Sequence, residues 1–150
     1  MAKARIIIMT VLALLFTQSV FAEGEAVKVQ NKFKEYFKNT AMKVKQVNDP
    51  AEKRAILNNS FDKMQNTLDK VTKLANISEK DFSAISEVKG SIQEKYNELN
   101  GLSGYKKVND SELNNFADYV QQDMEQADQW VTISVTTLLL VALLLVLLLR

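Results

Sequence analysis

The sequence predicts an all-α protein whose last helix continues into a C-terminal transmembrane helix. Apolar residues recur at spacings of three and four through the middle of the chain, which is the periodicity of a helix face. Only one proline and four glycines interrupt the 150 residues, and a leucine-rich run closes the chain. The expected arrangement is an antiparallel up-down-up-down four-helix bundle. A helical hairpin or coiled coil that completes its core on oligomerising is the alternative.

The N-terminus has the form of a secretory signal peptide. Lys3 and Arg5 make a short positive region, and residues 6–16 form an apolar run of about 11 residues, the length of a signal core. Small residues around Ala22 then suit a signal peptidase. We therefore expect cleavage of residues 1–22, with an uncleaved N-terminal anchor as the alternative. The helical domain is expected over residues 23–130.

The first two helices of this domain meet at the only proline. The first helix is expected over about residues 27–47, with Phe33 and Phe37 on its inner face. Asp49 can cap the second helix and Pro50 suits its first turn. The second helix carries a heptad seam, the cleanest periodic pattern of the domain. Its members are Leu57, Phe61, Met64, Leu68, Val71 and Ala75.

The third and fourth helices are also bounded by caps. Ser78 opens the third helix with an acid three residues later, and Gly101 closes it. Asn109 opens the fourth helix. No breaker separates the fourth helix from the terminal run, so one continuous helix is expected from about residue 110 into the bilayer. The expected inner faces are Phe82, Ile85, Val88, Ile92, Tyr96 and Leu99 in the third helix, and Leu113, Phe116, Val120, Met124 and Ala127 in the fourth.

Charge favours this helix order. The expected first helix holds six lysines and a single acid, whereas residues 109–130 hold six acids and no base. The first and fourth helices are neighbours in an up-down-up-down bundle, so opposite charges would face each other. Each exposed pair contributes only about 0.2–1 kcal/mol, and its value lies in selecting the arrangement.

Residues 131–149 have the length and composition of a membrane span. Nineteen residues at about 1.5 Å rise give about 29 Å, close to the thickness of a hydrocarbon core. Trp130 stands at the border, where an indole prefers the headgroup zone. Arg150 is the only charge beyond the run. Positively charged residues that flank a membrane span stay on the cytoplasmic side. We therefore expect Arg150 to be cytoplasmic and the domain to lie on the extracytoplasmic (periplasmic or outer) face.

The tail is similar in outline to bacterial C-terminal sorting signals, in which a hydrophobic span ends in a positive charge. Such signals carry a short motif before the span, such as Leu-Pro-x-Thr-Gly, and residues 126–130 contain none. The run of small residues that a GPI signal needs is also missing. A permanent anchor is therefore expected, and removal by a sorting enzyme is the alternative.

The composition argues against catalysis, metal binding and nucleic-acid binding. Histidine and cysteine are absent, which removes the commonest general base, the thiolate nucleophile and the commonest metal ligands. Without Lys3 and Arg5 the basic residues number 17 against 18 acids, so charge gives no reason to expect nucleic acid as a partner. Two carboxylate pairs stand among polar residues and are expected to be solvated; they are Glu94 with Glu98 and Asp118 with Glu125.

The longest expected loop, residues 101–108, is the candidate partner site. It carries Tyr105, Lys106 and Lys107. It lacks the spacing and the preceding strand of a phosphate-binding loop. In an alternating bundle that enters the membrane from its fourth helix, this loop lies at the end away from the bilayer. We therefore predict that these three residues face a partner.

Two functions fit these observations. The first is a non-enzymatic, membrane-tethered interaction or scaffold module of the cell envelope, without a cofactor, that binds a protein partner or itself. The alternative is an extracytoplasmic sensor or carrier domain that binds a lipid or small apolar ligand within the bundle. That ligand would lie among the phenylalanines expected on inner faces, which are Phe33, Phe37, Phe61, Phe82 and Phe116.

Overall fold

The computed structural model describes residues 31–74, 77–126 and 133–148. Every regular element in these residues is a helix, so the prediction of an all-α fold is confirmed. The predicted signal peptide, residues 1–22, lies outside the described residues. The first helix is described over residues 31–46, and the elements after it are α2 (Pro50–Leu74), α3 (Glu79–Asn100), the short 3-10 helix η1 (Asp110–Glu112), α4 (Leu113–Gln126) and α6 (Val135–Leu148).

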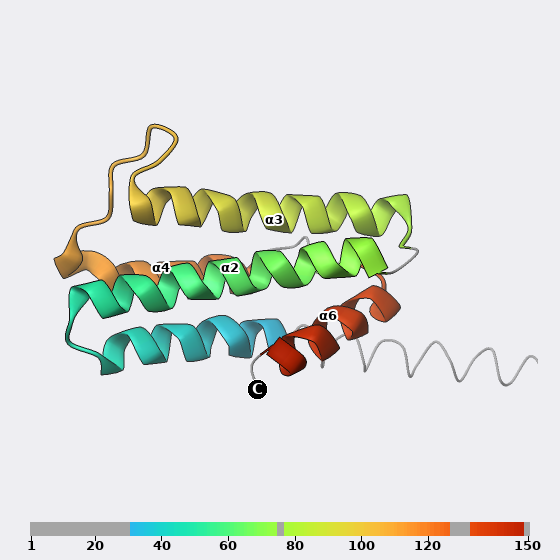
Figure 1. Ribbon diagram of the computed structural model, residues 1–150, viewed down its shortest axis with the longest axis horizontal. Helices are drawn as coiled ribbons and strands as arrows, with labels where there is room; N and C mark the ends of the chain where they lie inside the picture. Colours follow the sequence, from blue (N-terminus) through green and yellow to red (C-terminus); the bar gives the residue numbers. More distant parts are fainter. Residues whose placement is uncertain (1–30, 75–76, 127–132, 149–150) are drawn as a thin grey trace, which may run out of the picture.

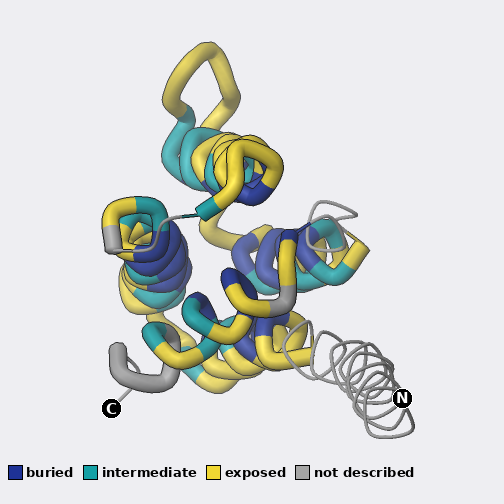
Figure 2. The backbone as a smooth tube through the Cα atoms, turned by 90° about the vertical axis from the view of Figure 1, so that its right-hand side faces the viewer, coloured by how far each residue is buried: buried dark blue, intermediate teal, exposed yellow. Residues whose placement is uncertain are grey.

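The helices from the first to α4 lie side by side and alternate in direction (Figure 1). α2 is the centre of the arrangement, because it contacts α3, α4 and α6. Viewed along the helices, the buried parts of each helix turn toward a common interior (Figure 2). The connections before α2 and before α3 are short, and a short turn returns the chain beside the helix it has just left. A longer loop, residues 101–109, joins α3 to η1.

The predicted seam of α2 is confirmed over the described residues, because all its members up to Val71 are buried. The inner faces of the first helix and α4 are also buried. Each of these three helices thus contributes one apolar stripe to a single core, as an amphipathic helix must. The largest fully buried side chains include Phe33, Phe37, Leu57, Phe61, Met64, Leu68 and Leu113.

The inner face of α3 differs from the prediction at its two ends. Phe82 was expected inside, but 54% of its surface is exposed. Asp81 is buried in place of Phe82, with only 3% of its surface exposed. Lys95 is buried in place of Tyr96, with only 4% exposed. The seam of α3 therefore runs one residue earlier at these two turns. The charged side chains are accommodated because neighbouring helices supply their polar partners, as buried charges require.

The predicted caps of α2 and α3 are confirmed. The backbone N–H of Ala51 donates to Asp49 Oδ1 at 3.2 Å, and that of Asp81 donates to Ser78 Oγ at 3.1 Å. Gly101 ends α3 with φ 70°, in the left-handed region that favours glycine. A Cβ at Gly101 would also lie 2.8 Å from the backbone N of Lys107. This close approach fixes where the following loop begins.

The prediction of one continuous helix from about residue 110 through the terminal run is wrong. Residues 133–134 are not helical, and α6 begins only at Val135. α6 then turns back across the bundle and packs against α2 (Figure 1). In the described part of the chain, no helix is both long enough and apolar enough to cross a membrane. At the start of α6, Ser134 and Thr137 bond to the carboxylate of Asp81 on α3, which favours a new helix start at this point.

One ion pair connects the first helix to α4 within the described residues, between Lys45 Nζ and Asp118 Oδ1 at 2.5 Å. Both side chains are largely exposed, so the pair adds little stability. The pair instead favours the first helix and α4 as neighbours, because these two helices carry opposite charges.

Lys95 connects α3 to α4 inside the bundle. Its ammonium lies 3.2 Å from Glu98 Oε1 and 3.4 Å from Asp123 Oδ2, and it also bonds the hydroxyl of Tyr119. The same ammonium lies 4.3 Å from the centre of the Tyr119 ring. Burial by itself would lower the pKa of Lys95, but these hydrogen bonds and carboxylates raise it well above its usual range.

Replacing Lys95 by alanine should destabilise the protein by about 2–3 kcal/mol, because two carboxylates lose a buried partner. Lys95→Met keeps the apolar stem and should cost less. Urea unfolding followed by circular dichroism measures both, with the exposed Lys70→Met as the control.

The pH dependence follows from the raised pKa of Lys95. A lysine whose pKa is raised on folding contributes stability that is fully present below the pKa that it has in the unfolded chain. The deficit of K95M should therefore stay constant between about pH 7 and pH 10. A deficit that disappears within that range contradicts this account.

Candidate functional site

One polar site in the described residues joins the start of α3 to the start of α6. The carboxylate of Asp81 accepts three hydrogen bonds from the segment that opens α6. The backbone N–H of Ser134 donates to Oδ1 at 2.7 Å. The hydroxyls of Ser134 and Thr137 donate to Oδ2 at 2.5 and 2.7 Å. Asp81 thus holds the first turn of α6 from a position more than 50 residues earlier in the chain.

The chemistry of a helix start explains this contact. The first backbone N–H groups of a helix have no partner within the helix, and its N-terminus carries a partial positive charge. Ser134 precedes α6, and its Oγ accepts from the backbone N–H of Thr137 at 3.4 Å. Asp81 adds a negative charge to this end. A carboxylate in this position therefore stabilises both the start of α6 and its place beside α3.

The environment of Asp81 favours its ionised form. Burial alone would raise its pKa, but the hydrogen bonds from Ser134 and Thr137, with the charge of Lys80, together lower the pKa of Asp81 below its ordinary value of 3.8. The carboxylate is therefore charged at neutral pH. The contact is a structural connection, and it leaves no proton to exchange in a reaction near pH 7.

α6 presents apolar side chains on two opposite sides. Leu138 and Val141 are buried in the core, and Ile133 is buried just before the helix. On the opposite side, Leu139 and Leu143 have 42% and 56% of their surfaces exposed. A helix that only completes a core has a polar outer side. Within the described side chains, the outer side of α6 carries these two leucines beside the exposed Thr136, so packing against α2 covers only part of its apolar surface.

The predicted partner-facing loop projects from one end of the bundle (Figures 1 and 2). Tyr105, Lys106 and Lys107 are all exposed, and the two lysine ammonium groups have no partner in the described residues. Tyr105 donates its hydroxyl to Glu94 Oε1 at 2.9 Å, and this hydrogen bond is the main cause of its raised pKa. The prediction that these residues face a partner remains a prediction.

Arg54, which was not singled out in the sequence, holds the base of this loop. From α2 its guanidinium donates to the carbonyls of Leu99 and Val108, at 2.5 and 2.8 Å. It also pairs with Asp110 Oδ1 at 2.8 Å. The two ends of the loop are therefore bound to one side chain. Nothing local in the sequence around Arg54 signals this role, because its partners lie about 50 residues later.

The carboxylate pairs do not form a shared site. Glu94 accepts from Tyr105, and Glu98 pairs with Lys95. Asp118 pairs with Lys45, and Glu125 accepts from the side chain of Gln121 at 2.9 Å. Each carboxylate thus has a separate partner. Carboxylate pairs that act as acid and base instead face one site, where different environments move their pKa values apart.

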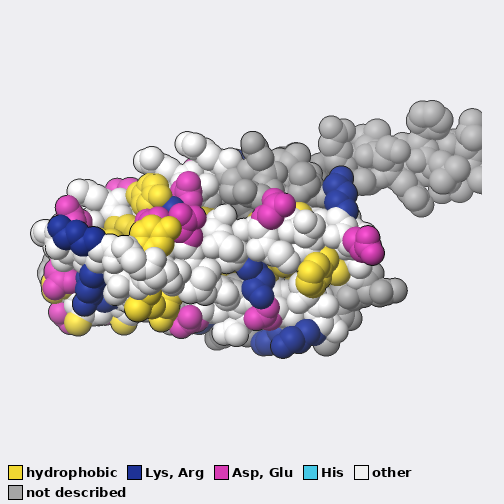
Figure 3. Space-filling model, turned by 90° about the horizontal axis from the view of Figure 1, so that it is seen from above, with side chains coloured by type: hydrophobic (Ala, Val, Ile, Leu, Met, Phe, Trp, Pro, Cys, Tyr) yellow, Lys and Arg dark blue, Asp and Glu magenta, His cyan; other side chains and the backbone are white. Residues whose placement is uncertain are grey.

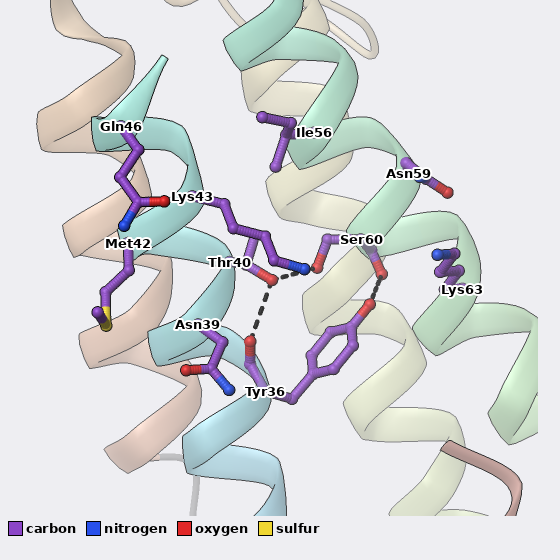
Figure 4. A pocket seen from close by; sticks show the side chains of 10 residues that line it. All are labelled: Tyr36, Asn39, Thr40, Met42, Lys43, Gln46, Ile56, Asn59, Ser60 and Lys63. Atoms are coloured by element: carbon purple, nitrogen blue, oxygen red, sulfur yellow. Dashed lines mark hydrogen bonds between the residues drawn. The ribbon is translucent and has the colours of Figure 1, made fainter. Parts of the chain in front are cut away.

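A groove of about 530 Å³ lies between the first helix and α2 (Figure 4). Its floor is a small network of hydroxyls. Tyr36 donates its hydroxyl to the Ser60 carbonyl at 2.9 Å, and the hydroxyls of Thr40 and Ser60 are 3.0 Å apart. Lys43 and Lys63 stand on opposite walls. No residue of this groove was singled out in the sequence as a site, because its two walls are about 20 residues apart in the chain.

The face of the molecule that carries α3 has a different character. Basic, acidic and hydrophobic side chains are intermixed across it (Figure 3). Mixed charges of this kind are typical of a solvated surface, and they select no particular partner.

Replacing Asp81 by asparagine should loosen α6 without unfolding the bundle. We expect a loss of about 2–4 kcal/mol in the docking of α6, since charged hydrogen bonds are lost. Hydrogen exchange of residues 133–148 measures this loss. Because the pKa of Asp81 is lowered on folding, its contribution is present above the ordinary pKa and is lost as pH falls through the folded value. The wild type and D81N should therefore converge in acid.

The matched control for D81N is Asp62→Asn, an exposed aspartate of α2 with no partner in the described residues. This variant should leave exchange in residues 133–148 unchanged. If hydrogen exchange in α6 is as slow in D81N as in the wild type and in D62N at neutral pH, Asp81 does not hold the helix.

Comparison with known proteins identifies no relative. No family model, no curated protein and no solved structure matches this chain. Its function is therefore inferred from its own residues and their geometry.

Proposed function

We propose that this protein is an exported, membrane-tethered helical interaction or scaffold module of the cell envelope, without enzymatic activity. The observation that carries the proposal is the apolar outer side of α6, where Leu139 and Leu143 are exposed. Leucines on the outside of a packed helix are costly in water, and they favour contact with lipid. The apolar run of residues 131–149 extends this surface to the length of a span.

In this proposal the terminal run leaves α2 when a bilayer is present. Asp81 then becomes hydrated, so undocking leaves no unpaired charge in the core. Each hydrogen bond that Asp81 gives up costs about 1.5–3 kcal/mol, net of the water that replaces it. Each leucine placed near the bilayer centre contributes about 0.3–0.6 kcal/mol, and the run holds many of them. The two sets of terms are of similar size, so contact with a bilayer can shift the terminal run between the two positions.

The orientation follows from the signal peptide and the charges. Residues 1–22 direct the chain to export, residues 23–130 stand on the extracytoplasmic face, and Arg150 stays cytoplasmic. The loop with Lys106 and Lys107 lies at the end of the bundle opposite the end of α4 (Figure 1). It would therefore point away from the membrane, toward a protein partner or a second copy.

The alternative function, a sensor or carrier of an apolar ligand within the bundle, has less support. Phe33, Phe37 and Phe61 are each at most 2% exposed and pack within the core. Phe82 is exposed to solvent, and the groove between the first helix and α2 contains no phenylalanine. A ligand among the phenylalanines would have to displace packed side chains, which costs several kcal/mol.

The tether is tested by washing membranes of cells that express the full chain with alkaline carbonate. The wild type should stay with the membrane. Leu139→Asp with Leu143→Asp should be released, because each charge near the middle of a span costs about 2.5–3.5 kcal/mol. Leu102→Asp is the matched control, since Leu102 is an exposed leucine of the loop. Release of the wild type, or retention of the double variant, would rule out the proposed tether.

A further inference from the structure

The groove between the first helix and α2 has the size of a binding site. Its volume of about 530 Å³ falls within the range of ligand-binding clefts. The hydroxyl groups of Tyr36, Thr40 and Ser60 bond to one another or to helix carbonyls on its floor. The floor is therefore neutral and fixed. What can bind there is decided by the walls.

The walls of the groove are basic. Lys43 extends from the first helix and Lys63 from α2 (Figure 4), and no aspartate or glutamate lines the groove. Neither ammonium has an ion-pair partner in the described residues. Two unpaired cations that face one cleft from both sides attract an anion and disfavour a cation. The ligand should thus carry negative charge.

The polar groups on the walls favour a peptide over a lipid. Asn39 and Gln46 on the first helix and Asn59 on α2 have side-chain amides without partners in the described residues. Amides both donate and accept, as peptide backbone groups do, whereas an alkyl chain would leave them unpaired. The aliphatic side chains of the lining are Met42, which is 49% exposed, and Ile56, and the ring of Tyr36 lies at the floor. That surface fits one or two side chains, and methionine adapts to different shapes.

We propose that this groove binds an acidic peptide segment of a protein partner. The carboxylates of the peptide pair with Lys43 and Lys63, and its backbone bonds to the amides of the walls. One of its apolar side chains contacts Met42 and Ile56. This inference deepens the proposed role as an interaction module and rests on it. It assigns the partner's chemistry to a site separate from the loop of Tyr105.

The test is a selection of random twelve-residue peptides, displayed on phage, against the full chain in detergent. The selected peptides should be enriched in aspartate and glutamate and keep an apolar residue. A selected peptide is then synthesised and titrated by fluorescence anisotropy. Its affinity should fall about tenfold or more in the variant Lys43→Glu with Lys63→Glu, and it should weaken as salt is raised.

The matched control is Lys70→Glu with Lys73→Glu, which makes the same charge change on exposed residues of α2 outside the groove. It should keep the affinity within about twofold. Melting curves check that both variants remain folded. A selected pool without acidic enrichment, or equal losses in both variants, overturns the proposal. So does displacement of the peptide by phosphatidylglycerol vesicles but not by neutral ones, which would assign the groove to lipid.

The two proposals fail separately. Loss of peptide binding with normal retention in the carbonate wash would reject the groove and leave the tether standing. Peptide binding by a protein that washes off the membrane would reject the tether alone.

Discussion

The buried seam of α2 is the constraint on which the rest of the structure depends. Met64, Leu68 and Val71 are fully buried, and α2 contacts α3, α4 and α6. Each such side chain contributes about 1.5–3 kcal/mol when it is removed from water. Because the other helices are placed against this one, α2 also places the sites. One side of α2 forms a wall of the groove, and another receives α6.

Buried charge then decides which helices stand beside α3. Asp81 and Lys95 occupy seam positions near its two ends, where apolar residues would pack equally well with any neighbour. Asp81 requires donors and finds them at the start of α6, whereas Lys95 requires acceptors and finds them on α3 and α4. A wrong neighbour would leave a charge unpaired in the core, which is a strong penalty. The two residues thus select the arrangement more than they add stability.

The sequence predicted the helices, the seam of α2 and the caps at Asp49, Ser78 and Gly101, because these depend on neighbours within a few residues. It did not predict the contacts of Asp81 or Arg54, whose partners lie some 50 residues away. An acid in register with Ile85 and Val88 is the one local signal that Asp81 faces inward. The docking of α6 was missed for a related reason. Hydropathy describes how much a segment avoids water, but not whether protein or lipid covers it.

The proposed tether requires that α6, which packs on α2, leaves it when a bilayer is present. The chain has no cysteine, so Lys73→Cys on α2 and Leu139→Cys on α6 can carry spin labels without interference. Pulsed electron resonance measures the distance between the two labels. We expect one short, narrow distance in aqueous buffer and a longer distance in lipid nanodiscs. The same short distance in both conditions would rule out release of α6 into the bilayer.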